Sequence, residues 1–307
     1  MGKVGIIVDS SCGLMQKEAE KKGLYYAPIV INFDGKDMKS GVDITNDFLY
    51  KNMTMKSKVK TSAVPMATMF DLITKAEKEN DSVIIITISK YISSGNDNAK
   101  VIAKDFKNVT VYDSKFVTPW IFHILDTILD LASKGKKDKI LDLLARQDKA
   151  MWGILAPETL EFLYSGGRIS KTQYIMGNLL KIIPLIPLIN GELDNTGVIK
   201  TRSETKAGKR MADELDIEYK RLIKSGIKKN ELEVATINVN SKKIHKEIRK
   251  ALEKKGYENI GVGFMTPEII SHTGPKLAGC GIRMKNLAIK DKPKSKAKAK
   301  PKAKATK

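Results

Sequence analysis

Val83-Ile84-Ile85-Ile86-Thr87-Ile88 is an unbroken run of β-branched residues, and the polar residue Ser89 follows it at once. Such a run predicts a buried strand, because β-branched side chains favour strands and a strand covered on both faces is apolar throughout. Similar short runs that also end in polar residues are Val4 to Val8 before Asp9 and Val109 to Tyr112 before Asp113.

Amphipathic stretches with helical periodicity separate these strands, for example Met66 to Lys78 and Ile121 to Lys134. Strands that alternate with helices are typical of an α/β domain, in which helices cover the faces of a parallel sheet. Ligands bind such sheets at the carboxyl ends of the strands. We therefore expect a site near the polar residues that follow the strands, which are Asp9-Ser10-Ser11, Ser93-Ser94-Gly95 and Asp113-Ser114.

A second alternation of strands and helices follows the Gly166-Gly167 turn. Its predicted strands are residues 197–201, 233–239 and 260–264, and its predicted helices are residues 171–180, 206–224 and 242–255. The sequence therefore predicts a two-domain α/β protein. We place the domains at residues 1–158 and 159–285, followed by a lysine-rich tail at residues 286–307.

The tail holds much of the formal net charge of +20. Residues 290–307 contain nine lysines and one aspartate, a charge of +8, which leaves 20 − 8 = +12 for the rest of the 307-residue chain. This composition cannot form an apolar core, so we expect the tail to be disordered. Its lysines suit transient contact with an anionic membrane. We expect no specific nucleic acid partner.

The sequence indicates a soluble, cytoplasmic protein without a metal or cofactor. Cys12 and Cys280 lie in unrelated contexts, which favours neither a zinc site nor a disulfide framework. The longest apolar segment, Leu179 to Ile189, contains a lysine and two prolines and is shorter than the roughly 20 residues that span a bilayer. The first apolar run, Val4 to Val8, is too short for a signal peptide.

Several short motifs are suited to binding an anion. They are Val8-Asp9-Ser10-Ser11, Thr61-Ser62, Ile92-Ser93-Ser94-Gly95, Val111-Tyr112-Asp113-Ser114-Lys115, Leu163-Tyr164-Ser165-Gly166-Gly167-Arg168-Ile169-Ser170 and His272-Thr273-Gly274-Pro275. In this order and spacing the motifs resemble the DegV family, the fatty-acid-binding subunits of bacterial fatty acid kinase. The resemblance covers about residues 4–283.

The resemblance implies a DegV-like fold: a parallel α/β/α domain, a C-terminal α/β domain, and a long-chain fatty acid buried between them. It further implies a binding subunit without catalytic residues of its own. The subunit would present the carboxylate to a separate ATP-dependent kinase, which forms an acyl phosphate for phospholipid synthesis. Because catalysis belongs to the partner, the chain itself is not expected to be an enzyme.

The resemblance also assigns residues. The carboxylate would be held by the Thr-Ser pair, the Ser-Ser-Gly loop and the His-x-Gly-Pro motif, which here are Thr61, Ser62, Ser93, Ser94, Gly95, His272 and Gly274. Arg168 and Arg202 would lie near the ligand mouth and contact the kinase or the acyl phosphate.

This chain departs from the family pattern at two places. Gly95 runs directly into Asn96-Asp97-Asn98, as if several residues had been deleted, so the serine that contacts the carboxylate stays open. Thr118-Pro119-Trp120-Ile121-Phe122 stands where the family tends to have glycines, and this bulk would narrow or reshape the acyl tunnel.

Physical chemistry supports the same kind of ligand. An ionised carboxylate that leaves water needs several donors or a cation, and two hydroxyls, backbone N–H groups at a helix start and an imidazole would supply them. At about 0.8 kcal/mol for each buried CH₂, a tail of ~14 methylenes contributes roughly 11 kcal/mol before the entropy of binding is subtracted. Candidate tunnel residues are Ile92, Phe116, Ile175, Leu179, Ile182, Ile186, Phe264 and Ile270.

Two alternative functions stay open. A hydrolase would use Ser94 as nucleophile, His272 as base and Asp113 to orient the histidine, but the G-x-S-x-G motif is absent from the sequence. A basic nucleic-acid-binding protein would rest on charge alone.

Individual residues also have structural interpretations. Ser62 would cap a helix that begins near Pro65, and Asp9 would cap another helix. His123 lies in an apolar helix pattern and is expected in the core, whereas His245 is expected on a charged surface.

Overall fold

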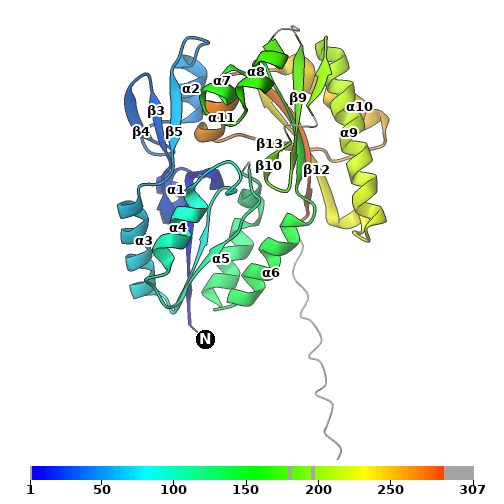
Figure 1. Ribbon diagram of the computed structural model, residues 1–307. Helices are drawn as coiled ribbons and strands as arrows, with labels where there is room; N and C mark the ends of the chain where they lie inside the picture. Colours follow the sequence, from blue (N-terminus) through cyan, green and yellow to red (C-terminus); the bar gives the residue numbers. More distant parts are fainter. Residues whose placement is uncertain (1, 118, 179–181, 195–197, 287–307) are drawn as a thin grey trace, which may run out of the picture.

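A four-stranded parallel sheet forms the lower half of the molecule in Figure 1. The computed structural model describes residues 2–117, 119–178, 182–194 and 198–286. In spatial order, the strands are β2 (Tyr25–Ala27), β1 (Val4–Asp9), β6 (Ser82–Ile86) and β7 (Val109–Tyr112). All three pairings are parallel, as the sequence predicts.

Alternate side chains of these strands pack against helices on opposite faces of the sheet. Ile7 and Ile85 pack in one core with α3 and α4, whereas Ile6 and Ile84 pack in another with α5 and α6. This period of two is why the strands are apolar throughout. The helices of this half are α1 (Gln16–Lys21), α3 (Met66–Glu79), α4 (Gly95–Ala103), α5 (Leu125–Ser133) and α6 (Lys137–Asp148).

The helix predicted at residues 121–134 begins later than expected. A 3-10 helix, Pro119–Ile124, precedes α5. The indole of Trp120 packs against Gly281, where an added Cβ would lie 2.6 Å from Trp120 Cζ2. The bulk of Trp120 is therefore used in packing between the two halves of the protein.

A small antiparallel sheet, which the sequence analysis did not predict, lies between β2 and α3 in the chain. It contains β3 (Val30–Phe33), β4 (Lys36–Lys39) and β5 (Val59–Ser62), and α2 (Asn46–Asn52) connects β4 to β5. Its buried residues Ile31 and Val59 join the same core as Ile7 and Ile85. The small sheet is important for the site because β5 ends in Thr61 and Ser62.

The second large sheet has seven strands and is mostly antiparallel. Its strands are β8 (Trp152–Pro157), β9 (Ile183–Ile189), β10 (Glu192–Leu193), β11 (Ile199–Thr201), β12 (Leu232–Val239), β13 (Gly261–Gly263) and β14 (Leu277–Met284). Among the described strands of this sheet, only β12 and β13 pair in parallel. The predicted alternation identified β11, β12 and β13 but not β9, whose two prolines disfavour a strand assignment.

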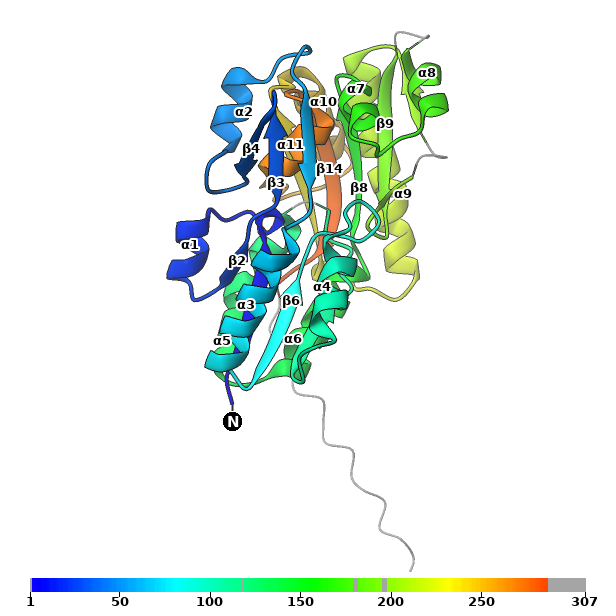
Figure 2. The ribbon, with the colours of Figure 1, turned by 60° about the vertical axis from the view of Figure 1, so that its left-hand side comes forward.

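Helices α9 (Glu204–Lys224) and α10 (Lys242–Lys254) cover one face of this sheet. On α9, Ala207, Met211 and Leu215 recur every four residues and face the sheet, while the Ser203 hydroxyl accepts the Lys206 N–H and caps the helix start. The opposite face meets the small sheet through α7 (Glu161–Ser165) and α11 (Pro267–Thr273), and α8 (Lys171–Asn178) follows α7. Figure 2 shows α11 between the small sheet and β14.

The predicted domain boundary after residue 158 does not coincide with the boundary between the two large sheets. β8 precedes Glu158, the predicted end of the first domain, yet it pairs with β9 and β14 of the second sheet. The division into domains at residues 1–158 and 159–285 stays a prediction. The lysine-rich tail beyond residue 286 lies outside the described residues.

Asp9 at the carboxyl end of β1 is a buried acid that connects two segments. Its Oδ1 accepts the Ser11 N–H at 3.1 Å, which caps the 3-10 helix Ser10–Cys12 as expected, and its Oδ2 accepts the Ile88 N–H at 2.7 Å. Burial, with a smaller contribution from the neighbouring Glu268 carboxyl, raises the pKa of Asp9 to about 7.

The raised pKa of Asp9 predicts that the free energy of unfolding falls as pH rises. Because the folded-state pKa lies above the unfolded value, protonated Asp9 favours the folded state at low pH, and this contribution is lost between about pH 4 and pH 7. Its size is on the order of 4 kcal/mol. Denaturant unfolding of Asp9→Asn should show a weaker loss of stability across this window than the parent, whereas Asp71→Asn on the exposed face of α3 should keep the parental slope. Parallel pH profiles for the parent and Asp9→Asn would contradict the assignment.

Candidate functional site

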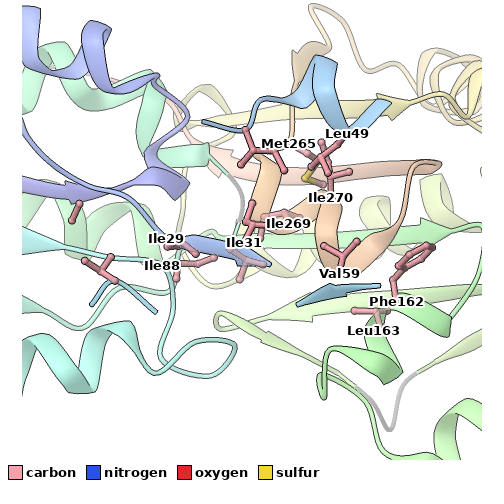
Figure 3. Close-up of a cluster of buried hydrophobic side chains, with 14 of the residues drawn as sticks. Ile29, Ile31, Leu49, Val59, Ile88, Phe162, Leu163, Met265, Ile269 and Ile270 are labelled. Atoms are coloured by element: carbon pink, nitrogen blue, oxygen red, sulfur yellow. The ribbon is translucent and has the colours of Figure 1, made fainter. Parts of the chain in front are cut away.

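A cavity lies where the first sheet, the small sheet and the second sheet meet. The space free of atoms inside it, open mouth included, is about 710 Å³. Its walls are mostly apolar, and Figure 3 shows Ile29, Ile88, Leu163 and Ile269 among the buried side chains of this region. The polar residues that line it are Thr61, Ser62, Ser93, Ser94, Arg168, Glu268, His272 and Thr273.

A hydrogen bond joins two of the predicted site residues in the wall of this cavity. Thr61 Oγ1 on β5 and His272 Nε2 on α11 lie 2.7 Å apart. Burial, with a smaller contribution from the nearby Arg168 charge, lowers the pKa of His272 to about 3. The imidazole is therefore neutral at pH 7, and with the Thr61 hydroxyl it provides polar contacts without a charge.

The serine loop lies directly before α4. Ser93 Oγ accepts the Gly95 N–H at 3.2 Å, which leaves the Ser93 hydroxyl proton free to be donated, and the exposed Ser94 provides no side-chain cap to the helix. Because α4 begins at Gly95, the loop is short. Both serines line the cavity, so the choice between them as the carboxylate contact stays open.

Asn96, which the sequence analysis did not select, anchors this loop. Its buried amide nitrogen donates to Thr87 Oγ1 at 3.0 Å and to the Tyr112 carbonyl at 2.8 Å, at the ends of β6 and β7. An asparagine in the first turn of a helix is common in sequences. Only the positions of Thr87 and Tyr112 in space reveal this role.

Arg168 supplies a positive charge at the cavity. Its Nε and Nη2 donate to the Ile92 carbonyl at 3.2 and 3.1 Å, and its Nη1 donates to the Gly166 carbonyl. Burial lowers the pKa of this guanidinium, but an arginine side chain keeps its charge at pH 7 because its ordinary pKa is so high. The donors expected from the sequence for the carboxylate were neutral: hydroxyls, backbone N–H groups and an imidazole. The structure adds the charged Arg168 side chain to the lining of the same cavity.

Arg168 also lines a second, outer hollow. This hollow shares Ile92, Ser93, Ser94, Arg168 and Leu193 with the cavity and adds the polar side chains of Lys90, Asp97 and Glu192. The serine loop and the guanidinium therefore separate an apolar interior from a polar exterior.

Gly166 makes room for His272. An added Cβ at Gly166 would lie 2.1 Å from His272 Nδ1, although the φ angle of −79° suits any residue. The glycine is required by this close approach rather than by the turn. Gly167, whose φ is +75°, supplies the left-handed conformation of the turn itself.

The remaining predicted carboxylate residues differ in position. Ser62 lines the cavity and does not cap α3, whose N-cap residue is Pro65. Gly95 and Gly274 are buried beside the cavity residues and are not part of its lining. Arg202 is exposed between β11 and α9 and also does not line the cavity.

The candidate tunnel residues are dispersed. Ile92 lines the cavity, whereas Phe116, Ile186 and Ile270 are packed into the cores of the two halves. Ile182 is half-buried, Ile175 is exposed, and Leu179 lies outside the described residues. Phe264 contacts Phe122 and lines a different cavity. Periodicity identifies buried residues, but it does not separate core positions from positions beside a cavity.

The catalytic arrangement of the hydrolase alternative is not formed. His272 Nε2 contacts Thr61, while Asp113 is half-exposed and pairs with Lys90 at 2.8 Å and Lys100 at 3.7 Å. Across the described ranges, no group of three or more His, Cys, Asp or Glu side chains is placed to hold a metal ion. In the same ranges, no helix combines the length and apolarity needed to cross a membrane.

The other two histidines serve structural roles. His123 is half-buried, its Nδ1 contacts the Trp120 carbonyl and its Nε2 lies 3.2 Å from the Met284 carbonyl. His245, expected on the surface, is also half-buried, with its Nε2 3.1 Å from Thr236 Oγ1.

These observations define an α/β protein with a parallel sheet, a second mixed sheet and an apolar cavity with a polar wall between them. A family model described as "Uncharacterised protein, DegV family" matches residues 3–285. The chain belongs to the DegV family, so the resemblance seen in the sequence is confirmed.

Three similar proteins illustrate the relationship. A DegV domain-containing protein from Caldanaerobacter subterraneus subsp. tengcongensis is 30% identical, covering 91% of this chain and 98% of that protein. A solved fatty-acid-binding DegV family protein from Streptococcus agalactiae is 26% identical with a TM-score of 0.77, covering 93% of this chain and 100% of that one. A solved stearic-acid-binding protein from Eubacterium ventriosum shares the fold, with 22% identity, a TM-score of 0.71, and coverage of 92% and 99%.

The fit between Gly166 and His272 leads to a prediction. In the parent protein, NMR titration of the His272 ring should show the neutral imidazole down to about pH 4, because burial lowers its pKa to about 3. Gly166→Ala should displace the ring toward solvent and move its pKa toward the ordinary value of about 6.5. Ser165→Ala, in the same turn but exposed, is the matched control and should leave the titration unchanged. An unaltered His272 pKa in Gly166→Ala would show that the contact does not hold the ring.

Proposed function

We propose that this protein is a carrier that buries a long-chain fatty acid and holds its carboxylate at the polar wall of the cavity. The supporting observation is that Thr61, His272, the serine loop and Arg168 come from distant parts of the chain and meet at one side of an apolar cavity. This arrangement matches an amphipathic ligand with a single anionic group. The fatty-acid-binding relatives support the same assignment.

In this proposal, each polar residue has a distinct part in carboxylate binding. The Arg168 charge offsets the loss of carboxylate hydration. The hydroxyls of Thr61 and of Ser93 or Ser94 donate to the carboxylate oxygens, and His272 orients the Thr61 hydroxyl through their 2.7 Å contact. Ser62, Gly95 and Gly274 shape the loops around the head group.

The proposal extends to a separate ATP-dependent kinase as the partner. A carboxylate oxygen of the bound acid would attack the terminal phosphorus of ATP, and ADP would leave, giving an acyl phosphate for phospholipid synthesis. The outer hollow next to Arg168 is the surface through which a partner would reach the carboxylate, because the serine loop and the guanidinium are shared by both spaces. The carrier itself supplies no catalytic residue.

We place this activity in the cytoplasm, with the lysine-rich tail making transient contact with an anionic membrane where fatty acids and phospholipids exchange. A specific nucleic acid partner is not part of the proposal, because much of the positive charge belongs to the tail.

Loss of the Thr61 hydroxyl tests the binding site. Thr61→Val keeps the shape of the side chain but removes a hydrogen bond to a charged ligand, which should weaken fatty acid binding by about 1.5 to 3 kcal/mol, or roughly 10- to 100-fold. Delipidated protein titrated with palmitate, followed by native mass spectrometry and calorimetry, measures the change. Thr172→Val on the exposed side of α8 is the control and should bind as the parent does. Equal affinity of Thr61→Val and the parent would remove Thr61 from the site.

Arg202 separates acid binding from coupling to a kinase. Because Arg202 is exposed and does not line the cavity, Arg202→Ala should leave palmitate affinity unchanged. Acyl-phosphate formation with the partner kinase should fall on the order of tenfold, as expected for one lost charged contact. Arg210→Ala, exposed on α9 and paired with Glu214, serves as the control for removing a surface charge. An Arg202→Ala variant that supports acyl-phosphate formation at the parental rate would exclude Arg202 from the partner surface.

A further inference from the structure

Glu268 is a buried acid in the wall of the cavity that the proposed carboxylate site does not use. It lies in the first turn of α11, is 3% exposed, and lines the same cavity as Thr61 and His272. The family resemblance assigns it no role. A carboxyl group in such a position is costly unless its oxygens are paired.

One oxygen of Glu268 is fully paired. Oε2 accepts the Ser40 hydroxyl at 2.6 Å and the Ser10 hydroxyl at 3.3 Å. Ser10 Oγ also accepts the Ile29 N–H at 3.2 Å, which leaves its proton for Glu268. These contacts make Oε2 an acceptor.

The other oxygen, Oε1, is buried and has no hydrogen-bond partner. Thr266 Oγ1 lies near enough to stabilise the charged form of the carboxyl, yet this hydroxyl is also buried and does not complete a hydrogen bond. Burial raises the pKa of Glu268 above its ordinary value. Since Oε2 is already paired with two hydroxyls, Oε1 is the carboxyl oxygen that still lacks a partner, on a residue that lines the cavity.

The spacing of Glu268 and His272 along α11 sets the distance between the two polar groups that a ligand would meet. The two residues are four apart on α11, so they project from the same side of the helix and are separated by about 6 Å along its axis. A ligand whose head group is held at Thr61, beside His272, would pass Glu268 a few carbons farther along its chain. A plain methylene there would leave Glu268 Oε1 without a hydrogen-bond partner, whereas a hydroxyl group would supply one.

We propose that Glu268 forms a second polar contact point for the acyl chain, and that the cavity selects fatty acids that carry a hydroxyl group a few carbons from the carboxylate. This inference rests on the proposed fatty acid binding and adds the subclass of ligand. The ligand hydroxyl forms the hydrogen bond that Glu268 Oε1 lacks. Sites built to pair with a ligand hydroxyl discriminate strongly against the analogue that lacks it.

Palmitate and a series of monohydroxypalmitates with the hydroxyl at successive positions near the carboxylate provide the test. Each acid is titrated into the delipidated full-length protein, and dissociation constants are measured by calorimetry. We expect one position of the hydroxyl to bind at least about tenfold more tightly than palmitate, the ratio that one satisfied hydrogen bond provides. Equal affinities for palmitate and for every hydroxy acid would overturn the inference and leave fatty acid binding intact.

Two substitutions assign the preference to Glu268. Glu268→Gln keeps a hydrogen-bonding group in place and should keep a preference for the hydroxy acid, whereas Glu268→Met should lose the preference and bind palmitate at least as tightly as the parent. Glu253→Met, exposed near the end of α10, is the control for the same chemical change. A preference that survives in Glu268→Met would overturn the role of Glu268. Should Glu268→Met fail to fold, the hydroxyl series on the parent protein and on Glu268→Gln still decides. Binding of none of the acids to the parent would instead overturn the proposed function itself.

Discussion

The packing of α11 between the small sheet and the second large sheet is the constraint on which the site depends. Ile269 and Ile270 of this helix are buried in the core that also contains Ile31 and Val59 of the small sheet. With α11 held there, His272 meets Thr61 and Glu268 meets Ser40, so the two polar contacts of the helix each reach the small sheet. The apolar core therefore fixes the distance between the polar groups.

Much of the first half of the fold could be predicted from the sequence. The parallel strands β1, β6 and β7 have dense β-branched runs, because both of their faces are covered, and such runs are easily recognised. The family and the α/β fold class are likewise confirmed. The small sheet was missed because its strands are short and partly polar, as in Lys36–Lys39. Strand β9 was missed because prolines at residues 184 and 187 are unusual in a strand with neighbours on both sides.

For the site, local motifs could be recognised from the sequence, whereas contacts between distant segments could not. Motifs identified Thr61, Ser93, Ser94, Arg168 and His272, which the fold brings to one cavity, although their proposed roles in binding stay predictions. Glu268 and Asn96 were not identified, because each acquires its importance from partners that are distant in the chain or in a neighbouring strand. Apolar spacing also could not distinguish Ile92, beside the cavity, from Phe116 and Ile270 in the core.

The contact between Gly166 and His272 has a consequence for how the sequence can change. An added side chain at residue 166 would overlap the imidazole of residue 272 in its present position, even though the backbone at 166 would accept any amino acid. The two positions are 106 residues apart, yet they share one volume. In descendants of this chain, a larger residue at 166 would fit without displacing the ring only after a smaller residue had replaced the histidine, so substitutions at this pair are coupled by space.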